Sequence, residues 1–218
     1  MTVRSNFEKS LVEIQQDILR MASLVEESIY NSMLSLNNQD VVLASKVIEG
    51  DDIIDGLKDE IEDKCITLIA TQQPMAKDLR VVITGIKILV SLERIGDHAV
   101  DIARTTMCLA DKNLIKPLVS LTHMAKLVQD MVSDGLDAYV QGDVNKARQM
   151  CDNDDEVDDI YHQVFRELVK YMKKDPEIVG QATYLLFVSR FLERIGDHAT
   201  NIGENVIYLV TGEKEELN

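Results

Sequence analysis

The sequence predicts an all-α protein made of two tandem, internally duplicated three-helix bundles. The chain contains one decapeptide twice, because residues 93–102 read ERIGDHAVDI and residues 193–202 read ERIGDHATNI. Apolar residues make up 45% of the chain while aromatic residues make up 5% and Trp is absent, which suits helix packing better than a β-sandwich. Only three prolines and ten glycines are available for turns, so we expect long helices with few connections.

The first two helices are predicted from apolar periodicity and from one capping residue. Asp40 follows a short polar stretch and is a good N-cap, so the first helix should cover residues 7–36 and the second should continue from Asp40 to about residue 71. Apolar residues recur at steps of three and four along the first helix, at Leu11, Ile14, Ile18, Met21, Val25, Ile29 and Met33. The second carries Val47, Ile54, Leu57, Ile61 and Leu68.

The remaining boundaries follow the prolines, which suit the start of a helix and not its interior. Pro74 precedes a third helix that should end near residue 109, Pro117 opens the fourth, and Pro176 precedes the last. With an offset of 103 residues, Asp40 aligns with Asp143 at the corresponding boundary of the second half. We therefore expect two domains, at residues 1–111 and 112–218, each of them a three-helix bundle.

Charge and cysteine content restrict the class of protein. A net charge of −15 argues against binding to nucleic acid, and it suits a protein that binds cations or basic partners. The first residues lack the apolar core of a signal peptide, and no apolar run approaches the roughly 18 residues of a spanning helix. Cys65, Cys108 and Cys151 form no CxxC pair. We expect a cytoplasmic protein with reduced, buried thiols.

Each half carries two acid-x-x-x-acid pairs, on its predicted second and third helices. Four-residue spacing stacks the two carboxylates of a pair on one helix face, where they repel, so a positive group should lie between them. Antiparallel neighbouring helices would bring four carboxylates to one patch, and oxygen ligands of this kind suit hard di- or trivalent cations. The candidate metal ligands are Asp51, Asp55, Glu93, Asp97, Asp154, Asp158, Glu193 and Asp197.

Other readings of these residues stay open. Acidic residues often form solvated helix faces, which is the stronger reading for Asp51 and Asp55 taken alone. The glycines of the repeat, residues 96 and 196, either permit close helix approach or mark a hinge. The arginines at 94 and 194 either orient the carboxylates or form surface ion pairs. His98 and His198 are expected to be hydrogen-bonding partners first and metal ligands second.

The tandem helical halves, the paired acidic motifs and the repeated Glu-Arg-Ile-Gly-Asp-His-Ala resemble the PhoU family of phosphate-transport regulatory proteins. The resemblance implies a cytoplasmic protein, commonly a homodimer, and the catalytic motifs missing from the sequence favour a non-enzymatic binding protein. It also implies association with the phosphate-specific ABC transporter and with a membrane sensor histidine kinase. Such a protein restrains phosphate uptake and the phosphate-starvation response when phosphate is plentiful.

The resemblance further implies multinuclear metal clusters, of iron or zinc, bound by the eight acidic residues named above. The family's commoner continuation of the motif, Asn-Ile-x-Glu, is kept in the second copy as Asn201 and Glu204. The first copy has Asp101 and Arg104 instead. The two sites are therefore expected to differ in nuclearity or affinity.

Two competing functions remain on the residues alone. A carboxylate-bridged di-metal enzyme would need Glu-x-x-His pairs on two helices, and the sequence has none. A phosphate-cradling GxxxxGK[ST] loop is also absent. The second alternative is a metal-free helical adaptor, which would keep the same stability in a chelator.

Overall fold

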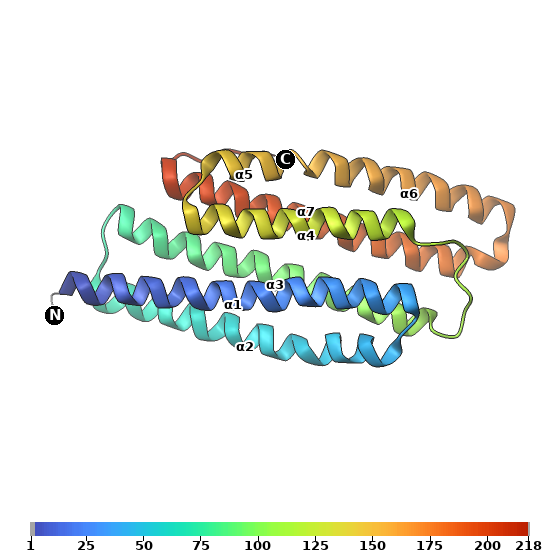
Figure 1. The fold of residues 1–218 in the computed structure, drawn as a ribbon, viewed down its shortest axis with the longest axis horizontal. Coiled ribbons are helices and arrows are strands. Elements are labelled where there is room, and N and C mark those ends of the chain that lie inside the picture. Colours follow the sequence, from blue (N-terminus) through green and yellow to red (C-terminus); the bar gives the residue numbers. More distant parts are fainter. Residues whose placement is uncertain (1–2, 218) are drawn as a thin grey trace.

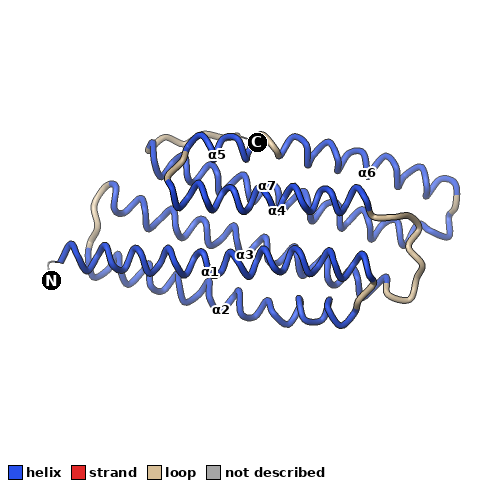
Figure 2. The backbone as a smooth tube through the Cα atoms, viewed as in Figure 1, coloured by secondary structure: helices blue, strands red, loops and turns tan. Residues whose placement is uncertain are grey.

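A computed structural model describes residues 3–217, with side chains from residue 6, and this part of the chain contains helices and no strand (Figures 1 and 2). The first half consists of α1 (Val3–Asn38), α2 (Val41–Gln72) and α3 (Lys77–Leu109). The second half consists of α4 (Val119–Gln141), α5 (Val144–Cys151), α6 (Asp154–Lys174), the short 3-10 helix η1 (Pro176–Ile178) and α7 (Val179–Thr211). The predicted all-α fold with two tandem three-helix bundles is confirmed, with α5 and α6 together taking the place of one helix.

The two halves begin their middle helical segment with the same cap. The Asp40 carboxylate accepts hydrogen bonds from the backbone N–H groups of Val42 and Leu43, at 2.9 and 3.0 Å. Asp143 caps α5 in the same way, with bonds of 2.9 and 3.1 Å. Each cap satisfies two of the N–H groups that a helix start leaves without a partner. Both predicted boundaries are therefore confirmed.

The second half departs from the first where α5 ends at Cys151 and α6 begins at Asp154. The acidic residues that follow the break occupy the first turn of α6, at Asp154, Asp155 and Glu156. Negative side chains stabilise a helix N-terminus and oppose a helix C-terminus, so this run favours a new start over a continued helix. The sequence comparison with the first half did not predict the break.

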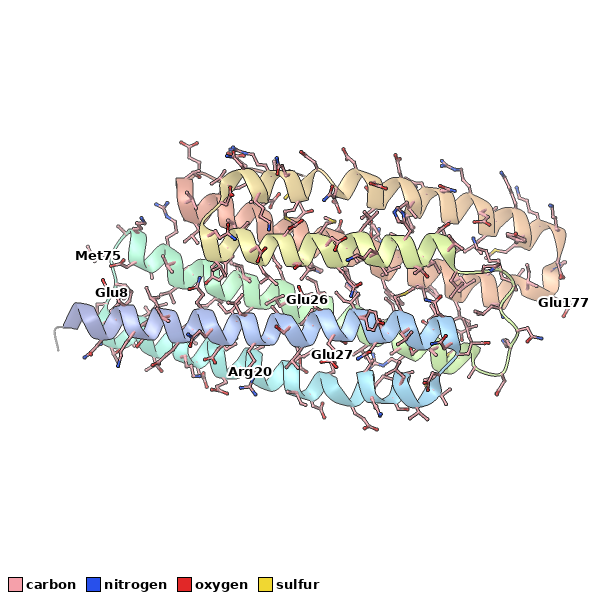
Figure 3. All side chains as sticks on the ribbon, in the orientation of Figure 1. Glu8, Arg20, Glu26, Glu27, Met75 and Glu177 are labelled. Atoms are coloured by element: carbon pink, nitrogen blue, oxygen red, sulfur yellow. The ribbon has the colours of Figure 1, made fainter. Side chains whose placement is uncertain are left out.

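Helices α3 and α7 lie side by side through the middle of the molecule, and α1 contacts α4 (Figure 1). Met75, just before α3, and Glu177, just before α7, lie at opposite ends of the molecule, so the two central helices run antiparallel (Figure 3). One hydrophobic core extends through both halves. The expected division at residue 111 falls in the loop between α3 and α4, and the division into two domains stays a prediction.

The apolar residues that predicted the first two helices lie in the core. The predicted positions of α1 are buried from Ile14 to Met33, Leu11 packs at the edge of the core, and all five predicted residues of α2 are buried. Polar faces interrupt the apolar ones, and within residues 3–217 no helix has the length and apolar character needed to cross a bilayer. Cys65 and Cys151 are buried as expected, whereas Cys108 is exposed on the last turn of α3.

Gly203 allows α7 to approach α5 closely. A Cβ atom at this position would lie 2.6 Å from the Sγ atom of Cys151, 2.9 Å from the Sδ atom of Met150 and 3.2 Å from the carbonyl oxygen of Ala147. Contacts this short require the neighbouring helix to move. The packing of α5 onto α7 therefore depends on the missing side chain.

We predict that Gly203→Ala lowers the free energy of unfolding by roughly 1–3 kcal/mol, because overpacking exceeds the gain of about 1 kcal/mol in helix propensity. Gly180→Ala is the matched control in the same helix, since no atom lies within 4 Å of its added Cβ. The control should be neutral or slightly stabilising. Urea unfolding of both variants tests this, and equal effects would contradict the packing argument.

Candidate metal centre

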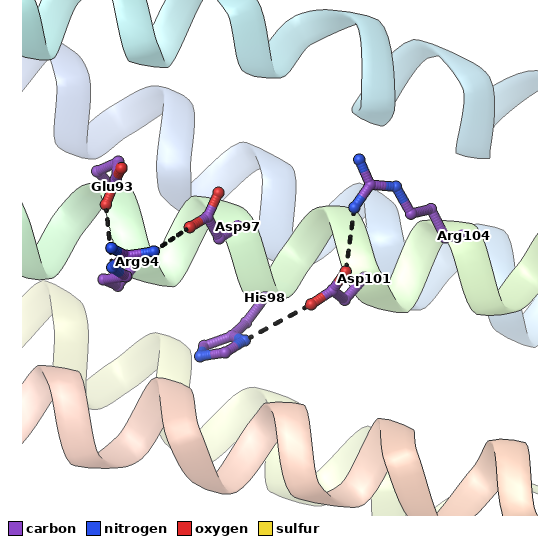
Figure 4. Close-up of polar contacts among 6 residues, drawn as sticks. All are labelled: Glu93, Arg94, Asp97, His98, Asp101 and Arg104. Carbon is purple, nitrogen blue, oxygen red and sulfur yellow. Dashed lines mark hydrogen bonds and ion pairs between the residues drawn. The ribbon is translucent and has the colours of Figure 1, made fainter.

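The first carboxylate cluster consists of Asp51 and Asp55 on α2 with Glu93 and Asp97 on α3. Glu93 and Asp97 project from the side of α3 that faces α2 (Figure 4). Burial raises the pKa of Asp51 to about 6, and the charges of Asp55 and Asp97 add to the rise. The pKa of Glu93 is also raised, mainly by burial, with contributions from Asp97 and Asp55. The structure therefore brings together the four acidic residues predicted for the first half.

The second carboxylate cluster consists of Asp154 and Asp158 on α6 with Glu193 and Asp197 on α7. Burial raises the pKa of Asp154 to about 6, and Asp197 and Asp158 raise it further. Burial raises the pKa of Glu193 to about 7, with Asp197 as the next cause. The pKa of Asp197 is raised by burial and by Asp158. Each of the four predicted residues of the second half thus lies within electrostatic reach of an acid on the other helix.

The repeated glycines make room for the carboxylates of the neighbouring helix. A Cβ atom on Gly196 would lie 2.7 Å from the Oδ1 atom of Asp154, which means that this carboxylate rests against the backbone of α7. A Cβ atom on Gly96 would lie 3.7 Å from the Oδ1 atom of Asp51, an ordinary contact. The reading of these glycines as sites of close helix approach is supported at Gly196, and the space at Gly96 is less restricted.

Arginines provide the positive charge expected between the stacked carboxylates. Arg94 contacts both acids of its pair, with its Nη1 atom 3.0 Å from the Oδ2 atom of Asp97 and its Nε atom 3.4 Å from the Oε2 atom of Glu93. The Nη1 atom of Arg194 lies 3.1 Å from the Oδ2 atom of Asp197. Both arginines are partly exposed, so each ion pair alone contributes little to stability. Both readings of these arginines, as residues that orient the carboxylates and as surface ion pairs, stay predictions.

Sequence reasoning missed three neighbours of the clusters. Arg190 forms an ion pair with Glu193 from a position three residues earlier on α7, a spacing that could have indicated it. Lys58 of α2 lies near enough to Glu93 to lower its pKa. Thr200 of α7 lies near enough to Asp154 to lower the pKa of that carboxyl, although its buried hydroxyl has no hydrogen-bond partner among the described residues. Lys58 and Thr200 act across helix contacts, so no local spacing reveals them.

The two histidines of the repeat lie at the contact between α3 and α7. Their rings stack with centroids 5.9 Å apart, and His98 also stacks on Phe191 at 5.9 Å. Burial lowers the pKa of both, that of His198 to about 4. The Nδ1 atom of His98 is buried and has no hydrogen-bond partner among the described residues, and the Oδ2 atom of Asp101 lies 3.9 Å away. The expected hydrogen bond at that atom is therefore not present.

The residues of the second cluster fit a cation. Glu193 is only 8% exposed, and its Oε2 atom is buried without a hydrogen-bond partner in the described part of the chain. A buried, unpaired carboxylate oxygen is costly unless a proton or a cation accompanies it. Within residues 3–217, no three His, Cys, Asp or Glu side chains already stand in a metal-enclosing arrangement. Metal binding by either cluster therefore stays a prediction.

The raised pKa of Glu193 predicts a pH-dependent stability of the metal-free protein. The folded state holds this proton more tightly than the unfolded state, so the stabilisation is complete below about pH 4.5 and is lost as the pH rises through about 7. Glu193→Gln removes the titration. In a chelator, its stability relative to the unaltered protein should rise by roughly 1–3 kcal/mol between about pH 4.5 and 7.5.

Urea unfolding at several pH values measures this difference. Glu156→Gln, which removes one charge at an exposed position on α6, is the control and should not reproduce this rise. A pH-independent effect of Glu193→Gln would show that this carboxyl titrates in the same way in the folded and unfolded states.

The chain is similar to known proteins over almost its whole length. The family model of the PhoU domain matches it twice, at residues 18–106 and 121–206. It is 45% identical to a phosphate-specific transport system accessory protein PhoU homolog from Clostridium acetobutylicum, over 99% of each chain. It is 43% identical to the homolog from Aquifex aeolicus, over 94% of this chain and 93% of the relative.

Solved structures agree with this similarity. The crystal structure of PhoU from Pseudomonas aeruginosa superimposes with a TM-score of 0.92 at 38% identity, covering 95% of this chain and all of the other. The phosphate transport system regulatory protein PhoU from Streptococcus pneumoniae superimposes with a TM-score of 0.90 at 32% identity, covering 96% and 99%. Both repeats of the sequence lie within the matched regions. The chain belongs to the PhoU family.

Proposed function

We propose that the protein is a cytoplasmic negative regulator of phosphate uptake and of phosphate-starvation signalling. The observation that carries the proposal is the near-full-length similarity to relatives named phosphate-specific transport system accessory proteins, which includes both repeats. The solved relative named as a phosphate transport system regulatory protein supports it. In this proposal the protein maintains phosphate homeostasis by binding to other proteins and catalyses no reaction itself.

The proposed partners are the cytoplasmic side of the phosphate-specific ABC transporter and a sensor histidine kinase. A net charge of −15 suits contact with basic patches, and such contact should weaken with salt. The same charge disfavours promoter DNA, so control over phosphate genes acts through protein contacts and signal transduction. The working form is a homodimer, and the membrane is reached only through partners.

Both carboxylate clusters are proposed to bind multinuclear clusters of di- or trivalent metal ions, with iron and zinc as the expected elements. Carboxylate oxygens are hard donors, and the unpaired oxygen of Glu193 supports a cation in the second cluster. The bound ions would supply positive charge that offsets repulsion among the acids. Arg94 and Arg194 orient the acids of α3 and α7, and Gly196 leaves room for Asp154.

Glu93→Gln combined with Asp97→Asn tests the metal role of the first cluster. The double change removes two charges with little change of shape, and it should lower the melting temperature of metal-loaded protein. A ligand at a hundredfold excess over its dissociation constant stabilises the folded state by about 2.7 kcal/mol, so the loss is measurable by calorimetry. In a chelator the change should be neutral or slightly stabilising, because the repulsion is removed.

Glu49→Gln combined with Asp159→Asn is the matched control, since both residues are exposed outside the clusters. It should leave the melting temperature of the loaded protein nearly unchanged. Elemental analysis of protein purified without a metal-affinity tag should find more than one di- or trivalent ion per chain. Equal destabilisation by the cluster variant with and without chelator would make its residues structural, as the metal-free adaptor requires.

Deletion of the gene tests the regulatory role. In its native host, loss of this protein should cause phosphate-starvation gene expression or excess phosphate uptake in phosphate-rich medium, because the restraint on transporter and kinase is removed. Reporter activity and phosphate uptake measure the two effects, and the unaltered gene supplied in trans should reverse them. Normal phosphate control in a deletion strain that lacks a second copy would contradict the assignment.

A further inference from the structure

The internal repeat places opposite charges at equivalent positions beside the two clusters. Counting 100 residues from the first copy to the second, Arg104 corresponds to Glu204 and Asp101 corresponds to Asn201. Besides Arg94 and Arg194, each cluster has a further basic neighbour on a helix of its own half, Lys58 near Glu93 and Arg190 at Glu193. Asp101 and Arg104 together carry no net charge, whereas Asn201 and Glu204 together carry one negative charge, so the second half is more acidic at these positions.

Arg104 places its guanidinium beside the first cluster. It extends from α3 toward α2, and its Nη1 atom lies 3.2 Å from the Oδ1 atom of Asp101 (Figure 4). Its charge also acts on Asp51, where it opposes the pKa rise that burial and the neighbouring acids cause. An arginine side chain does not lose its proton in proteins. A permanent cation therefore lies beside the first cluster, where its ion pair with Asp101 offsets part of its charge.

Glu204 adds negative charge at the equivalent place in the second half. Glu204 and Asp154 both act on the buried Cys151 thiol, whose pKa burial raises to about 12. The Oε1 atom of Glu204 accepts a hydrogen bond of 2.8 Å from the backbone N–H of Leu217. The unpaired Oε2 atom of Glu193 belongs to this cluster as well. The second half thus has an acid where the first half has Arg104, and its cluster contains a buried oxygen that has no hydrogen-bond partner among the described residues.

We propose that the two clusters are not equivalent: Arg104 acts as a built-in cation that weakens metal binding by the first cluster, so the second cluster binds di- or trivalent ions more tightly. This inference rests on the proposed metal-binding function. A fixed positive charge repels an incoming ion and already neutralises part of the acidic charge that would attract it. Arg104 is then a specificity-determining residue, since it decides which half of a duplicated protein is occupied first.

Manganese(II) titration of the full-length, tag-free and chelator-stripped protein tests the proposal by calorimetry. The unaltered protein should bind in two phases, and Glu193→Gln should remove the tighter one. Arg104→Glu, which introduces the residue type of the second half, should strengthen the weaker phase by about tenfold. Arg20→Glu is the charge-matched control on the exposed face of α1 and should leave both phases nearly unchanged (Figure 3).

Each outcome decides between the alternatives. A single class of equivalent sites, or equal effects of Arg104→Glu and Arg20→Glu, would overturn the inference while leaving metal binding intact. Survival of the tight phase in Glu193→Gln would overturn the assignment of that phase to the second cluster. If no manganese, iron or zinc bound to any of these proteins, both the inference and the proposed metal function would be wrong. Circular dichroism of each variant confirms that it is folded.

Discussion

The structure depends on one electrostatic constraint, the gathering of four carboxylates at a helix–helix contact in each half. Like charges at this spacing repel, and burial raises the pKa of Asp51, Asp154 and Glu193 well above the ordinary range. A fold that keeps such carboxylates together must offset their repulsion and the cost of burying them through favourable contacts elsewhere. The apolar core that runs through both halves provides that compensation, because it fixes α3 and α7 with the acids on their outer sides.

The duplicated decapeptide serves two contacts at once, which explains why its residue types alternate around the helix. Its acids face the outer helix of their own half, whereas its histidine faces the other half. Successive positions on a helix are about 100° apart, so Asp97 and His98 point to different neighbours. His98 meets His198 where α3 and α7 cross in opposite directions (Figure 1). Each copy of the decapeptide thus supplies two acids of one carboxylate cluster and one histidine of the contact between α3 and α7.

Much of this arrangement could be predicted from the sequence, because it depends on local patterns. The caps at Asp40 and Asp143, the apolar stripes and the membership of both clusters follow from spacing within single helices and from the internal offset. The contacts that could not be predicted lie between helices. Lys58 beside Glu93 and the stacking of His98 on Phe191 depend on how helices dock. The break between α5 and α6 was hidden because the first half has one continuous helix there.

The placement of the clusters determines which contacts a bound cation would strengthen. The first cluster joins α2 to α3 and the second joins α6 to α7. A cation bound at either cluster would therefore stabilise the contact of an outer helix with a central one. The contact of α3 with α7 is made instead by stacked rings, by apolar side chains and by Arg80 and Lys87 of α3 over the ring of Tyr208 of α7. A ligand shifts an equilibrium only by its different affinity for two states. The proposed cation binding would therefore act on the docking of α2 and α6 against the central helices.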